Sequence, residues 1–194
     1  MSTVAKTFLT PEEYLARERL ASFKSEFYRG ETFAMAGASE QHNLIVLNVG
    51  SVLREQLKGR PCRVYPSDLR LRIPVTGLFT YPDLMVVCDE PRFEFDRRDV
   101  LTNPNVIVEV LSPTTEAYDR GVKFEQYRTL ESLSQYVLIA QDRFAIDCFT
   151  RSMDGKWSLT SANEVEKTIE LTSIGCSLPL VEVYDKVEWP KIDL

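Results

Sequence analysis

The chain has few of the residues from which many functional sites are built. It contains a single histidine, His42, so clusters of histidine ligands are excluded. Its four cysteines are widely spaced and form no C-x-x-C pair, so the paired-cysteine motifs of redox and zinc sites are absent. Three of these cysteines lie in apolar, strand-like surroundings, where a reduced, buried thiol is the common state.

An excess of positive charge is also missing. The sequence holds 23 Lys and Arg against 29 Asp and Glu, a formal net charge of −6. Nucleic-acid-binding domains usually carry a basic footprint, and this chain has none over its whole length. Any contact with a nucleic acid must therefore come from a local patch or be offset by bound cations.

Long hydrophobic runs are absent as well. No apolar stretch approaches the roughly 18 residues that span a bilayer, and residues 1–6 do not resemble a secretory peptide. We therefore expect a soluble, cytoplasmic protein that makes no membrane contact. The length of 194 residues fits one domain, residues 1–194, with an ample core.

The helical signals are clear. Thr10 opens a capping box with Pro11 at the first helical position, which predicts a helix to about Leu20. Gly30 predicts a hairpin turn within residues 23–36. An apolar stripe predicts a long core helix over residues 40–58, and further helices are expected at 116–130 and 178–184.

Strands are predicted between these helices. Their expected ranges are 62–65, 68–73, 83–88, 106–111, 136–140, 144–150, 157–160 and 168–171. The strand, helix and strand over 106–140 should form a right-handed crossover between parallel neighbours, with the rest antiparallel. We expect an α/β or α+β fold in which one central mixed sheet is flanked by helices.

One residue conflicts with its surroundings. Glu109 lies within Val106–Leu111, a run that is otherwise wholly apolar and typical of a buried strand. An isolated ionised carboxylate there would be very costly, so it must be neutral, paired or bound to a cation. A buried Arg or Lys partner is one explanation, and a metal ion is another.

Asp83 supports the metal explanation. It begins the strand before Glu109, and on neighbouring strands the two carboxylates can meet at one edge of the sheet. Two acids and the Val110 carbonyl are the oxygen ligands that Mg²⁺ or Mn²⁺ prefers. Such an ion would lower the pKa of a water and neutralise charge on a phosphodiester. Lys123 could stabilise the same charge.

Each of these residues also has a simpler interpretation. Asp83 could fix a turn after Pro82, and Asp119 and Lys123, four apart on a helix, suggest a surface ion pair. Tyr127 suits core packing, and a lone His42 is more often structural than catalytic. Residues 68, 70 and 72 alternate as a solvated face, and Glu26 and Glu31 flank a turn where we expect exposure, although either could add an acid to the site.

The spacing of these residues resembles a large bacterial family of predicted restriction endonucleases of unknown function, within the PD-(D/E)XK nuclease superfamily. The resemblance rests on Pro82-Asp83, on Glu109 in Val-Glu-Val-Leu-Ser-Pro, and on Asp119-x-x-x-Lys123-x-x-x-Tyr127. Further matches are Glu26-x-x-x-Gly30, Met35, His42 and Ser67-Asp68. The resemblance covers about residues 8–185.

This resemblance implies a restriction-endonuclease-like fold and a Mg²⁺ (or Mn²⁺) site at Asp83 and Glu109. The superfamily places a lysine two residues after the acid, where this chain has Leu111. The family's matching lysine is Lys123 on the following helix. The implied activity is hydrolysis of DNA, with His42 and Tyr127 as secondary groups and a homodimer as the plausible assembly.

Two other functions are compatible with the same residues. The negative charge and the displaced lysine favour a catalytically inert binding or assembly module on the nuclease fold. Asp83 and Glu109 could also act as an acid and base on a glycoside, but few aromatic residues surround them for sugar stacking. Metal-dependent cleavage of DNA explains more of the pattern than either alternative.

Overall fold

The computed structural model describes residues 8–189. The expectations on residues 1–7 and 190–194, including the absence of a secretory peptide and the ends of the 1–194 domain, lie outside them. In the described part, no helix is both long enough and apolar enough to cross a membrane.

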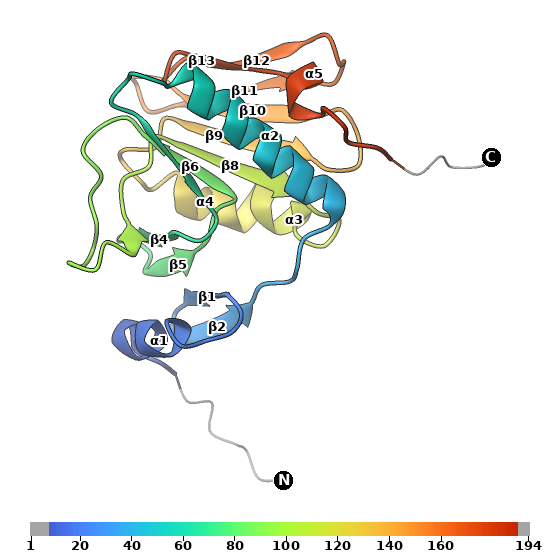
Figure 1. The fold of residues 1–194 in the computed structure, drawn as a ribbon. Helices are drawn as coiled ribbons and strands as arrows, with labels where there is room; N and C mark the ends of the chain where they lie inside the picture. Colours follow the sequence, from blue (N-terminus) through green and yellow to red (C-terminus); the bar gives the residue numbers. More distant parts are fainter. Residues whose placement is uncertain (1–7, 190–194) are drawn as a thin grey trace.

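A six-stranded mixed sheet forms the centre of the molecule (Figure 1). Its order is β11-β10-β9-β8-β6-β3. The strands are β3 (Arg63–Pro66), β6 (Leu84–Val87), β8 (Val106–Leu111), β9 (Gln135–Ala140), β10 (Ile146–Arg151) and β11 (Trp157–Ala162). Strands β8 and β9 are parallel, as the crossover predicted, and every other pair in this sheet is antiparallel.

The predicted central mixed sheet is present, but two smaller sheets that were not predicted accompany it. A five-stranded sheet has the order β2-β1-β5-β4-β7, and β12 pairs with β13. These strands are β1 (Ser25–Tyr28), β2 (Glu31–Ala34), β4 (Arg70–Ile73), β5 (Leu78–Thr80), β7 (Val100–Leu101), β12 (Thr168–Leu171) and β13 (Cys176–Pro179). A second parallel pair, β4 with β7, also departs from prediction.

Helices lie on both faces of the central sheet, with α2 on one face and α4 on the other (Figure 1). The helical segments are α1 (Pro11–Glu18), α2 (Glu40–Gln56), α3 (Glu116–Tyr118), a π-helical segment (Asp119–Lys123), α4 (Phe124–Tyr127) and α5 (Leu180–Val183), of which α1 packs against β1 of the five-stranded sheet. Helix α1 begins at the predicted cap, Thr10, and the side chain of Ser39 caps α2. At the start of α3, Thr115 makes no side-chain cap, and its hydroxyl lies 3.0 Å from that of Ser112.

The alternation of side chains along the strands builds two cores. Leu84 and Val86 of β6 pack on the α2 side, while Met85 and Val87 pack on the α4 side. Not every apolar side chain on the helical segments joins these cores, since Leu47 and Val122 are exposed. The predicted solvated face of β4 is also corrected: Arg70 is buried and donates to the Tyr81 hydroxyl.

The expectation of reduced thiols holds for only two cysteines. Cys148 and Cys176 are free and buried, but Cys62 and Cys88 form a disulfide. The pairing of Arg63 with Val87 explains it, because the next residues outward on these antiparallel strands are the two cysteines. Directly opposed residues hold their Cβ atoms close together.

Candidate active site

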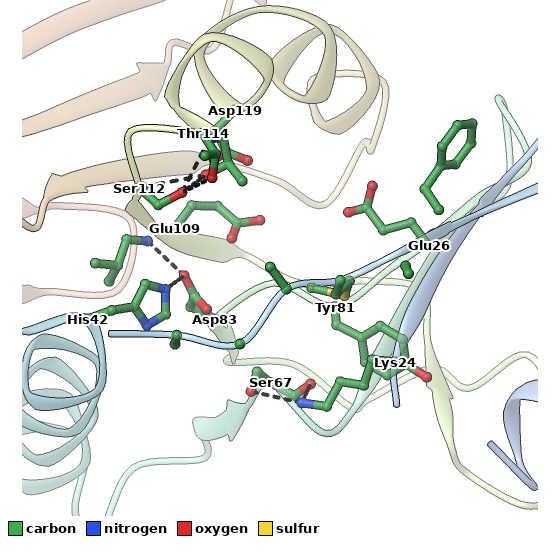
Figure 2. A pocket seen from close by; sticks show the side chains of 18 of the residues that line it. Lys24, Glu26, His42, Ser67, Tyr81, Asp83, Glu109, Ser112, Thr114 and Asp119 are labelled. Atoms are coloured by element: carbon green, nitrogen blue, oxygen red, sulfur yellow. Dashed lines mark hydrogen bonds and ion pairs between the residues drawn. The ribbon is translucent and has the colours of Figure 1, made fainter. Parts of the chain in front are cut away.

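Asp83 and Glu109 lie opposite each other where β6 begins. Leu84 pairs with Val108 in the antiparallel ladder, so one step further places Asp83 across from Glu109. Opposed residues project from the same face of a sheet. Both carboxylates line one cleft of about 920 Å³, and Figure 2 shows them pointing into the same space. The predicted convergence of these two acids is therefore present in the structure.

Hydrogen bonds fix Asp83. Its Oδ2 atom accepts the Val110 backbone N–H at 2.8 Å and lies 3.2 Å from His42 Nε2 (Figure 2). His42 reaches it from the first turn of α2, whose N-cap Ser39 accepts the His42 N–H. His42 therefore orients Asp83. The sequence had predicted His42 only as a secondary group of the site.

Two side chains contact the Glu109 carboxyl group. Lys123 Nζ lies 2.8 Å from its Oε1 atom, and the Tyr127 hydroxyl donates to the same oxygen at 2.6 Å. Burial in the sheet raises the pKa of Glu109 to about 8, while the Lys123 charge opposes that rise. Tyr127 is fully buried and does not line the cleft, so it positions Glu109 and does not face the solvent.

The π-helical segment brings Lys123 to the cleft. Its Nζ atom lies 3.2 Å from Asp119 Oδ1, and both side chains are buried, so the predicted surface ion pair is wrong. Burial alone would lower the pKa of Lys123, but the surrounding Glu109, Tyr127, Asp119 and Glu26 hold it well above its usual value. Such π-turns occur frequently at functional sites.

Glu26 is the site residue that the sequence placed wrongly. It was expected to be exposed, yet it is buried on β1 and points toward the cleft (Figure 2). Its Oε1 atom lies 3.6 Å from Lys123 Nζ and accepts the Thr80 hydroxyl, while Oε2 accepts the Tyr118 hydroxyl at 3.1 Å. The Glu26-x-x-x-Gly30 match was the only signal in the sequence that pointed to it.

The oxygen atoms at this edge of the sheet are suitable ligands for a divalent cation. Asp83 and Glu109 each direct one oxygen, Oδ2 and Oε1, at protein donors, and the described residues give Asp83 Oδ1 and Glu109 Oε2 no hydrogen bond. The Val110 N–H points at Asp83, and a strand residue directs its N–H and C=O to the same edge. The Val110 carbonyl thus faces the same place.

The charge balance supports the same conclusion. Glu109, Asp119 and Glu26 gather around one ammonium, Lys123, and Asp83 lines the same cleft. Within residues 8–189, no three His, Cys, Asp or Glu side chains form a group that could hold a metal by themselves. An ion here would complete its coordination with water or substrate oxygens, which is how Mg²⁺ is usually bound. The residues therefore fit a Mg²⁺ or Mn²⁺ ion.

Known proteins are similar to this chain in sequence. The model of the family Uma2, described as "Putative restriction endonuclease", matches residues 11–180. Two uncharacterized proteins of Synechocystis sp. (strain PCC 6803) are each 38% identical; sll1609 aligns over 89% of this chain and 98% of its own, and slr1290 over 91% of each.

A solved structure shares the fold. The crystal structure of a "putative nuclease belonging to DUF820" from Anabaena variabilis matches with a TM-score of 0.70 at 18% identity, over 91% of this chain and 97% of that one. At this identity the likeness establishes the fold, which is restriction-endonuclease-like. Because the family model spans almost the whole chain, the protein belongs to the Uma2 family.

Proposed function

We propose that the chain is a metal-dependent endonuclease that hydrolyses phosphodiester bonds of DNA. The observation that carries the proposal is the meeting of Asp83, Glu109 and Lys123 in one cleft, with Lys123 Nζ 2.8 Å from Glu109. Paired carboxylates beside a buried ammonium suit a reaction in which negative charge builds up on phosphate oxygens. The family described as restriction endonucleases supports the same class of substrate.

Each residue has a defined role in this proposal. Asp83, Glu109 and the Val110 carbonyl would hold Mg²⁺ or Mn²⁺. When bound, the ion would supply Lewis-acid chemistry, lowering the pKa of a water and neutralising charge on the phosphate. The Lys123 ammonium would keep its proton at Nζ and offset charge on the scissile phosphate. His42 and Tyr127 would hold the two carboxylates in place.

A catalytically inert module is the second candidate. The observation that favours it is that Lys123 is already surrounded by Glu109, Asp119 and Glu26, so its charge is largely matched. A screen with single-stranded, duplex and branched DNA separates the two. Mn²⁺-dependent cleavage by the purified wild-type chain supports the nuclease, and its absence on all three substrates supports the inert module. A homodimer and a cytoplasmic location stay predictions.

Metal binding should be detectable without any substrate. We expect Mn²⁺ or Mg²⁺ to raise the melting temperature of the wild-type protein, because a ligand bound only by the folded state stabilises it. The Asp83→Asn variant should lose this shift, since an amide oxygen carries no charge. Differential scanning calorimetry with and without EDTA measures both.

The control for this prediction is Asp89→Asn. Asp89 is exposed just after β6 and does not line the cleft. It should show the same metal-induced shift as wild type. Equal shifts in wild type and Asp83→Asn would contradict the assigned site, and no shift in wild type would contradict the metal.

A further inference from the structure

The lining of the cleft includes two aromatic side chains that are not packed into the core. Phe23 and Phe33 both line the cleft, and 62% and 50% of their surfaces are exposed. Large apolar side chains are usually buried, and a single exposed one needs no explanation. Two such rings in the lining of one cleft offer flat apolar surface to a ligand.

The register of the hairpin places one ring beside the acids. Phe33 on β2 is the direct partner of Glu26 on β1, so the two side chains share a face. Glu26 lies 3.6 Å from Lys123 Nζ, which lies 2.8 Å from Glu109. Phe33 is therefore separated from the proposed reaction centre by the width of a few side chains, within the reach of a nucleotide next to the scissile phosphate.

The cleft offers little to a phosphate backbone. Among its described lining residues, only Lys24, Lys123 and His42 can carry positive charge. Each is already engaged by a carboxylate, Asp68, Glu109 and Asp83 respectively. Duplex binding depends largely on cationic contacts to the phosphates of both strands. A bound metal ion would offset charge at one phosphate only.

Stacking supplies affinity where cations cannot. Proteins that bind single strands place successive bases on aromatic rings, and this works for any base because each has a π-face. In a duplex these faces are covered by neighbouring base pairs. We propose that Phe33, assisted by Phe23, is a stacking platform for unpaired bases, so that the substrate is single-stranded nucleic acid. This inference rests on the proposed phosphodiesterase function.

The test measures DNA binding in a variant that is expected not to cleave the DNA. In the Glu109→Gln chain with Mn²⁺, fluorescence anisotropy compares a short labelled single-stranded DNA with its duplex. We expect the single strand to bind more tightly. Phe33→Leu should weaken its binding roughly tenfold, the loss typical of one stacked base, while Phe33→Trp should keep it.

The control is Phe95→Ala, an exposed phenylalanine outside the cleft lining, which should leave binding unchanged. Equal binding by the Leu and Trp variants, tighter binding of the duplex, or no binding of either DNA overturns the platform. A Phe33→Leu change that alters only self-association overturns it in favour of an interface between copies. If wild type cleaves DNA but the Phe33 variants bind the single strand as tightly as the unsubstituted chain, only the platform is refuted. If the variants bind as expected but wild type does not cleave, only the phosphodiesterase function is refuted.

Discussion

Replacing Glu109 with glutamine should lower Mn²⁺-stimulated DNA cleavage by roughly two to three orders of magnitude, the loss seen when one preorganised electrostatic group is removed from an active site. Glutamine keeps the shape of the side chain and an oxygen that can accept the Tyr127 hydroxyl. It removes the acidic group that would hold the ion and that now lies 2.8 Å from Lys123 Nζ. A single-turnover cleavage assay with saturating metal measures the change.

The matched control is Glu125→Gln. Glu125 lies on α4, two residues beyond Lys123, but is exposed and does not line the cleft. The same chemical change there should leave the rate within twofold or so of wild type, as surface substitutions rarely do more. Wild-type rates in the Glu109→Gln chain would remove Glu109 from the mechanism.

Replacing Lys123 with methionine should destabilise the metal-free protein by roughly 3–5 kcal/mol, the cost of breaking a buried ion pair by removing one partner. The change leaves Glu109, Asp119 and Glu26 without the cation that they share. Unfolding by urea in EDTA measures the loss. Adding Mn²⁺ should restore part of it, because the ion supplies the missing positive charge.

A second substitution shows whether the lost stability comes from Glu109. The Lys123→Met, Glu109→Gln double variant should recover some of the stability, since residues in contact do not act additively. Lys58→Met is the control, because Lys58 is exposed and its ion pair with Glu55 is long, at 4.0 Å. If Lys123→Met were no more destabilising than Lys58→Met, the buried ammonium would not hold the carboxylates together.

The sequence was sufficient to predict that Asp83 and Glu109 lie close together. Glu109 in an apolar strand was a physical contradiction that needed a partner, and its position one strand from Asp83 pointed to a shared edge. The helix caps and the β8–β9 crossover were equally readable, because local hydrogen bonds and chirality fix them. These features depend on neighbours in the chain.

The parts that failed depend on neighbours in space. Asp119 and Lys123 have the spacing of a surface ion pair, but in the π-helical segment both are buried and Lys123 meets Glu26 of β1. The sequence predicted Glu26 as an exposed residue beside a turn. In the structure β1 pairs with β5, and the Thr80 hydroxyl donates to the Glu26 carboxylate. The Cys62–Cys88 disulfide follows from the pairing of β3 with β6, which periodicity does not encode.

The central claim is that Asp83 and Glu109 hold one divalent ion between them. Diffraction from crystals of the wild-type chain soaked in Mn²⁺, recorded near the manganese absorption edge, tests it most directly. We expect one strong anomalous peak in contact with a carboxylate oxygen of each residue and with the Val110 carbonyl. A peak bound elsewhere, or none at these oxygens while Lys123 keeps its contact with Glu109, would contradict the claim.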